Sequence, residues 1–121
     1  MSQNRRIILE GLQELSDSRQ SAPDAWVTFE ANGNEHWLQC LVTQLNMDWP
    51  FSSAPTENEN LKMCFGSDGS IEVHDWKADS YVTFTPALKD VDSLVRGIDS
   101  AFEDLFDLGG DYTLSYRIEN G

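Results

Sequence analysis

Basic residues are scarce in this chain of 121 residues. It holds 8 Lys and Arg residues against 21 Asp and Glu residues, which gives a formal net charge of −13 at pH 7. Nucleic acids and anionic membrane surfaces are negatively charged and repel such a chain, whereas basic partners are attracted. The composition therefore argues against nucleic acid and membrane partners and favours a protein partner with a basic surface. Solubility is a simpler explanation of the same charge.

Long hydrophobic runs are also absent. No apolar stretch approaches the roughly 20 residues of a membrane-spanning helix, and the N-terminus lacks the apolar core of a secretory signal, so we expect a cytoplasmic protein. Cys40 and Cys64 lie in segments predicted to be strands and lack the close spacing of a metal or redox motif. We expect buried, reduced thiols, with a disulfide as the less favoured alternative.

The common enzyme motifs are missing as well. The chain has no glycine-rich phosphate loop, no Gly-x-Ser-x-Gly turn, no His-Glu-x-x-His helix and no Cys-x-x-Cys pair. Its two histidines, His36 and His74, each lie beside a carboxylate and a tryptophan, but neighbouring residues on a strand point to opposite faces and cannot share one ligand. We therefore expect no enzyme activity, cofactor or metal. The alternative is a small enzyme or ligand-binding domain that uses His36 and His74.

Hydrophobic periodicity predicts a single α+β domain over residues 1–121. Apolar residues at helical spacing predict two helices, and alternating or continuous apolar runs predict strands. The predicted elements are a helix at 4–15, strands at 26–31, 35–45, 61–65, 71–75 and 80–84, a helix at 91–108 and a strand at 112–119. We expect an antiparallel sheet of about six strands with two helices packed on it, in the order α-β-β-β-β-β-α-β.

Turn residues refine this prediction. Asn32-Gly33 tolerates the positive φ angles of a tight turn, so the first two strands should form an antiparallel hairpin. The second strand is apolar enough to be central and covered on both faces. The segment 48–60 holds two prolines and little periodicity, which predicts an exposed loop, and residues 66–69 predict a turn between strands.

Acidic residues of the second helix are the first candidate binding site. Asp92, Asp99, Glu103 and Asp107 are predicted to share the face opposite the apolar stripe, with Asp104 nearer its flank. Like charges four residues apart on a helix cost roughly 0.2 to 0.5 kcal/mol per pair. Acids in the last turns also oppose the helix dipole, at about 0.3 to 1 kcal/mol each. We expect Asp99, Glu103, Asp104 and Asp107 to meet a basic partner, with neutral drift as the alternative.

Aromatic residues outside the regular pattern are the second candidate. Trp49 and Phe51 flank a proline at the start of the predicted loop, and Trp76 follows the fourth strand at a turn. Tryptophans at such positions often anchor interfaces, so these three residues are predicted to bind the partner. The alternative is that they seal the ends of the core, and this is favoured for Trp76.

Three segments carry a family resemblance: Trp37-Leu-Gln-Cys, Leu45-Asn-Met-Asp-Trp-Pro, and the 91–108 helix before a Tyr-x-Leu-x-Tyr strand. In these and in its order of elements, over about residues 4–119, the chain resembles the type III secretion chaperone-like superfamily, which includes the relatives called TY-Chap. The resemblance implies helices on one face of an antiparallel sheet, commonly a homodimer, that holds another protein without catalytic residues. Secretion chaperones generally end on a further helix, whereas this chain is predicted to end on a strand.

The expected function is therefore that of an acidic, non-enzymatic domain that binds and neutralises another protein. An immunity protein that binds a bacterial toxin is the leading expectation, because nuclease toxins carry basic grooves that an acidic inhibitor complements. A secretion or effector chaperone is the alternative that the resemblance implies.

Overall fold

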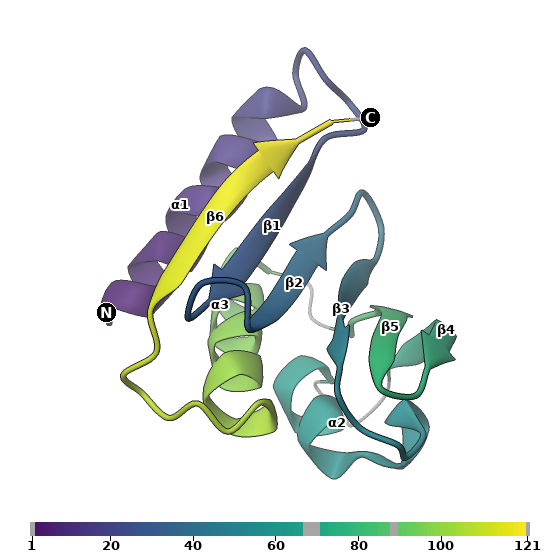
Figure 1. The fold of residues 1–121 in the computed structure, drawn as a ribbon. Helices are drawn as coiled ribbons and strands as arrows, with labels where there is room; N and C mark the ends of the chain where they lie inside the picture. The colour runs from purple at the N-terminus through teal and green to yellow at the C-terminus, as the bar shows by residue number, and fades with distance from the viewer. Residues whose placement is uncertain (1, 67–70, 88–89, 121) are drawn as a thin grey trace.

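Helices on one side of an antiparallel sheet make up the fold, which a computed structural model describes for residues 2–66, 71–87 and 90–120 (Figure 1). The elements in chain order are α1 (Gln3–Ser18), β1 (Trp26–Ala31), β2 (His36–Cys40), β3 (Leu45–Trp49), a 3₁₀ turn η1 (Pro55–Glu57), α2 (Glu59–Phe65), β4 (Glu72–Lys77), β5 (Ser80–Thr85), α3 (Val91–Ser100), a π-helical turn η2 (Ala101–Leu105) and β6 (Leu114–Glu119). The strands lie in the order β4-β5-β3-β2-β1-β6, and all neighbours are antiparallel. The predicted α+β class is confirmed, with one helix more than expected.

The predicted hairpin of β1 and β2 is confirmed. Asn32 and Gly33 have positive φ angles of 52° and 82°, and Ala31 pairs with His36 across the turn. The single strand predicted at 35–45 was wrong, because it is two strands, β2 and β3, joined by a turn that the Leu41 amide closes on the Gln44 carbonyl at 2.8 Å. The turn contains no Gly, Pro, Asn, Asp or Ser, so none of the usual turn residues marks it in the sequence. β2 is central, as expected, but in the described parts of the chain helices cover only one of its two faces.

A helix replaces the strand predicted at 61–65. Asn58 caps α2, since its Oδ1 accepts a hydrogen bond from the Leu61 amide at 2.9 Å. A short apolar run cannot be assigned to strand or helix by periodicity alone, and here the buried residues Leu61, Cys64 and Phe65 follow helical spacing. The predicted loop 48–60 was also wrong in part, because it contains the end of β3, η1 and the start of α2. The predicted turn at 66–69 lies, apart from Gly66, outside the described residues.

The second predicted helix is confirmed as α3 and its continuation. Asp90 caps it, with its Oδ1 accepting from the Ser93 amide at 2.7 Å. After Ser100 the helix widens, and the Phe106 amide bonds to the Ala101 carbonyl at 2.9 Å, five residues back. Asp107 and Gly109, with φ angles of 58° and 73°, then end the helix.

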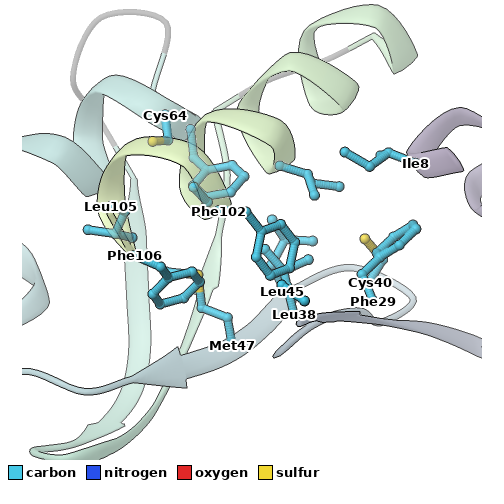
Figure 2. Packing of buried hydrophobic residues seen from close by; sticks show 14 of the residues in the cluster. Ile8, Phe29, Leu38, Cys40, Leu45, Met47, Cys64, Phe102, Leu105 and Phe106 are labelled. Carbon is cyan, nitrogen blue, oxygen red and sulfur yellow. The ribbon is translucent and has the colours of Figure 1, made fainter. Parts of the chain in front are cut away.

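The core lies between the helices and the covered face of the sheet (Figure 2). Gly11 brings α1 close to this face, because a Cβ atom at this position would lie 2.7 Å from the ring of Phe29. Both cysteines are free and buried, as predicted, at opposite sides of the cluster in Figure 2. Burial raises the pKa of the Cys40 thiol and of the Cys64 thiol to about 12.

Candidate functional site

The other face of the sheet has no helix over it in the part of the chain that the structure describes. We call this surface the open face. Its residues alternate along the strands with the buried residues of the core. It comprises Trp26, Thr28 and Glu30 of β1, Trp37 and Gln39 of β2, Asn46 and Asp48 of β3, Asp75 and Lys77 of β4, Tyr81 and Thr83 of β5, and Ser115, Arg117 and Glu119 of β6.

A ladder of side-chain hydrogen bonds crosses the open face. Thr83 Oγ1 donates to Asn46 Oδ1 at 2.9 Å, and Asn46 Nδ2 donates to Gln39 Oε1 at 3.2 Å. Gln39 Nε2 continues to Thr28 Oγ1 at 3.3 Å, and Thr28 Oγ1 donates to Glu119 Oε2 at 2.7 Å. The register places Thr83, Asn46, Gln39 and Thr28 directly opposite one another, and Thr28 reaches Glu119 diagonally, since it is Arg117 that lies opposite Thr28. The ladder therefore links the strands from β5 to β6.

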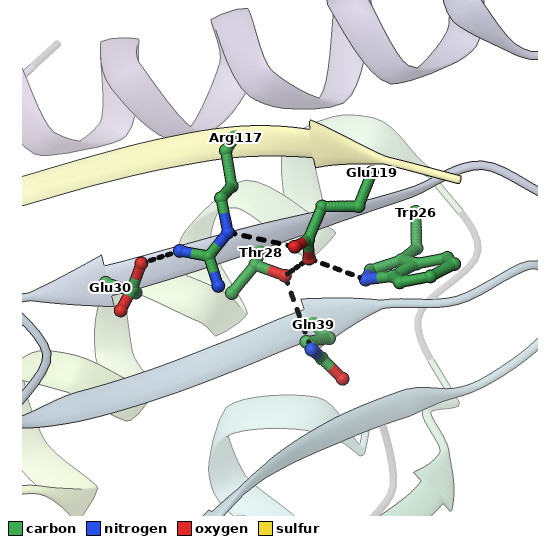
Figure 3. A network of polar contacts seen from close by, with 6 residues as sticks. All are labelled: Trp26, Thr28, Glu30, Gln39, Arg117 and Glu119. Atoms are coloured by element: carbon green, nitrogen blue, oxygen red, sulfur yellow. Dashed lines mark hydrogen bonds and ion pairs between the residues drawn. The ribbon is translucent and has the colours of Figure 1, made fainter. Parts of the chain in front are cut away.

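Glu119 ends the ladder as a fixed carboxylate (Figure 3). Besides the bond from Thr28, it accepts hydrogen bonds from Trp26 Nε1 at 2.9 Å and from Arg117 Nε at 3.0 Å. The bond from Thr28 is the largest cause, followed by that from Arg117, of the lowered pKa of Glu119. Arg117 also forms an ion pair with Glu30, which extends the network along the sheet.

Trp37 lies beside this network in a shallow hollow of about 320 Å³. The hollow is lined by Thr28, Glu30, Asn34, Trp37, Gln39 and Arg117. Trp26 and Trp37 are both half-buried, so each ring is held by its neighbours and still offers apolar area. Side chains that are already hydrogen-bonded in place lose little conformational entropy on binding. The open face is therefore suited to contact another surface.

Asp99 is the clearest failure among the predicted site residues. It is buried, with 5% of its surface exposed, and not on an exposed acidic face. Its Oδ1 accepts from Tyr112 Oη at 2.7 Å, and its Oδ2 lies 2.8 Å from Arg5 Nε. Eight residues after Val91, at about 100° per residue, Asp99 lies about 80° from the centre of the stripe and only about 20° beyond its outermost apolar residue, so its angle could have shown that it sits at the stripe's edge.

The other acids of the second helix stay candidates. Asp104 and Asp107 are exposed and Glu103 is half-buried, all after the point where the helix widens. Asp104 lines a hollow of about 360 Å³ with Met63, whose side chain is 79% exposed. Their role in binding a partner stays a prediction.

The predicted aromatic site does not form as one surface. Trp49 is fully buried on β3, and its Nε1 donates to the Ser53 carbonyl at 3.0 Å, so the prediction of an exposed anchor was wrong. Phe51 packs edge-on against Trp49 with ring centres 4.7 Å apart and is half-buried. Trp76 lies within the edge strand β4, 38% exposed, and remains a candidate.

The structure does not bring the two histidines together. His36 on β2 and His74 on β4 are separated by β3 and β5, which amounts to about 14 Å at the usual strand spacing. His36 Nδ1 lies 2.8 Å from Asp48 Oδ2, and its ring stacks on Phe106. His74 Nε2 lies 2.6 Å from Thr85 Oγ1. The described residues contain no group of three metal-ligating side chains.

Sequence reasoning missed the open face, although its signal was present. Polar and aromatic residues alternate with apolar ones in Trp26-Val-Thr-Phe-Glu and again in Leu114-Ser-Tyr-Arg-Ile-Glu. Each pattern predicts a strand with one face away from the core, but the register that joins these faces depends on the assembled sheet.

Comparisons with protein-family models, with curated proteins and with solved structures found no match for this chain. Among the helices of the described residues, none has the length and apolar character needed to cross a membrane.

Proposed function

We propose that this domain binds another protein through its open face, and that the partner's contact surface is basic. The ladder from Thr83 to Glu119 carries the proposal. Covering polar side chains with a partner costs free energy unless they are already hydrogen-bonded. Here they are tied together across five strands, beside two half-buried tryptophans.

Charge supports a basic partner. The open face has four acids, Glu30, Asp48, Asp75 and Glu119, against the basic residues Lys77 and Arg117. The net charge of −13 extends the negative potential beyond this face. Complementary charge raises the association rate and disfavours partners of the wrong sign. A partner such as a nuclease toxin, whose groove binds phosphates, has the required basic surface.

The biological role that fits these properties best is neutralisation of such a partner by covering its groove, as an immunity protein does. A secretion or effector chaperone is the second candidate, because helices on one side of an antiparallel sheet are the layering that the resemblance to the type III secretion chaperone-like superfamily implied. Both roles are non-enzymatic and cytoplasmic. The resemblance also implies a homodimer.

The test compares two tryptophans in affinity capture from the source cell. Trp37→Ala removes one of the two tryptophan rings of the open face, and Trp76→Ala removes a ring that is 38% exposed on the edge strand β4. If the proposal holds, Trp37→Ala weakens capture at least tenfold, as expected for an interface anchor, and Trp76→Ala leaves it unchanged. Wild-type capture should also weaken as salt concentration rises.

Two further arms make the result decisive. The captured protein is purified, and its affinity for each variant is measured by calorimetry, with circular dichroism to confirm that each variant is folded. A double variant, Glu103→Lys with Asp107→Lys, reverses charge at the end of the second helix. The open-face proposal is wrong if this variant or Trp76→Ala abolishes binding while Trp37→Ala binds like the wild type.

A further inference from the structure

The hollow beside Trp37 contains a carboxylate that can take a second cation. Glu30 lies in its lining, with 21% of the side chain exposed, and its Oε1 forms the ion pair with Arg117. Its Oε2 receives no hydrogen bond from the residues that the structure describes. A carboxylate can accept hydrogen bonds at both of its oxygens. Glu30 therefore has an oxygen left for a donor that comes from outside the chain.

Charge in this part of the open face is not balanced. Arg117 lies between Glu30 and Glu119, so two carboxylates share one guanidinium and one negative charge is left in excess (Figure 3). Glu119 already accepts hydrogen bonds from Trp26, Thr28 and Arg117. An incoming cation therefore finds its free acceptor at Glu30 and not at Glu119.

Glu30 and Trp37 are direct neighbours across β1 and β2. The Asn32 amide donates to the Thr113 carbonyl on the β6 side, so the backbone groups of Glu30, two residues earlier, also point to β6. Glu30 and Trp37 thus form a non-hydrogen-bonded pair, in which the Cα atoms are only about 4.5 Å apart and the side chains lie closest. A cation held by Glu30 comes within reach of the ring of Trp37, whose face attracts positive charge.

We propose that the partner inserts an arginine side chain into this hollow, where its guanidinium pairs with Glu30 Oε2 and stacks on the ring of Trp37. A guanidinium is planar and less strongly hydrated than an ammonium, so it suits a site made of a carboxylate and an aromatic ring better than lysine does. The volume of about 320 Å³ is enough for one such side chain. This inference rests on the proposed function, because it names the residue that the partner contributes to the open face.

The experiment titrates a hexa-arginine peptide with blocked ends into the full chain. An ionic strength of about 0.15 M screens the attraction of acids more than about 8 Å away. We expect a saturable shift of the indole N–H NMR signal of Trp37, which Trp37→Phe identifies among the four tryptophans. A hexalysine peptide, which has the same charge, should bind about fivefold or more weakly.

Two glutamate variants form the matched pair, with circular dichroism to confirm that each is folded. Glu30→Gln should weaken hexa-arginine binding about fivefold or more, because it removes the carboxylate and keeps the shape of the side chain. Glu57→Gln removes an exposed carboxylate from η1, away from the hollow, and should bind like the wild type.

The inference is overturned if hexa-arginine causes no saturable shift of the Trp37 signal, if hexalysine binds as tightly, or if Glu30→Gln binds like Glu57→Gln. Capture of the partner separates this failure from that of the proposed function. Capture that depends on Trp37 but tolerates Glu30→Gln keeps the open face as the contact surface and rejects the arginine in the hollow. Capture that tolerates Trp37→Ala rejects both.

Discussion

Replacing Asp99 by alanine should destabilise the fold by roughly 2 to 3 kcal/mol. The bond from Tyr112 is the larger part, because hydrogen bonds to charged groups contribute about 1.5 to 3 kcal/mol and the variant leaves the buried hydroxyl without an acceptor. The pair with Arg5 adds at most about 1 kcal/mol, since 39% of the Arg5 side chain is exposed. Better helix propensity of alanine and relief of a buried charge offset part of this loss.

The assay is urea unfolding followed by circular dichroism, with Asp104→Ala as the matched control. Asp104 is exposed near the same helix end, and its replacement should change the unfolding free energy by less than about 0.5 kcal/mol. Combining Asp99→Ala with Tyr112→Phe should reveal a coupling of about 0.5 to 3 kcal/mol, because both changes remove the same bond.

The pH dependence of stability gives an independent readout of the same bond. Burial, followed by the hydrogen bond to Asp99, raises the pKa of Tyr112 above its ordinary value of 10.0. The unfolded chain therefore loses this proton before the folded chain does. The stability contributed by Tyr112 is complete below pH 10 and falls as the pH rises above it. Tyr112→Phe should remove this part of the alkaline loss.

One result would refute the structural role of Asp99. If Asp99→Ala unfolded at the same urea concentration as Asp104→Ala, Asp99 would not be a buried partner of Tyr112 and Arg5. If the same stable variant also lost partner binding, the prediction from the sequence would hold instead, and Asp99 would belong to an exposed acidic surface that contacts the partner.

Further outcomes follow from close packing and from the buried thiols. Gly11→Ala should gain about 1 kcal/mol of helix propensity, but its Cβ would lie 2.7 Å from the fully buried ring of Phe29. Overpacking of this kind costs about 1 to 3 kcal/mol, so we expect the variant to unfold at a lower urea concentration than the wild type. Gly110→Ala is the control and should not be destabilised by overpacking, because its Cβ would meet no atom closer than 3.9 Å. The raised pKa values of Cys40 and Cys64 should slow their reaction with a thiol reagent at pH 8 roughly a thousandfold relative to free cysteine. Reaction of both thiols at the free rate would contradict this burial.

Local signals in the sequence predicted much of the fold. Asn32-Gly33 predicted the hairpin, and the apolar spacing from Val91 predicted the second helix, because turn conformation and amphipathic periodicity depend on neighbouring residues. The prediction of secondary structure failed where one segment fits both a strand and a helix. The run Leu61 to Phe65 fits a strand or a helix, and the cap from Asn58 with burial against the other helices decided for the helix.

The candidate site was harder to predict than the fold. Acidic charge and the lack of catalytic motifs are properties of composition, so they carried over from the sequence to the proposed binding function. The position of each acidic residue in the folded protein could not be predicted in the same way. Asp99 was expected on the surface, but Tyr112 follows it by 13 residues and Arg5 precedes it by 94, and only packing brings the three together.

The sequence by itself determined the acidity, the alternation of strand residues and the apolar stripes, and hence a sheet with helices on it. The tertiary structure decided which surface is left open and which charges meet. The hydrogen-bonded ladder needs five strands in register, and register is a property of the assembled sheet. The ion pair of Arg5 with Asp99 arises in the same way, because α1 and α3 lie against each other only in the folded protein.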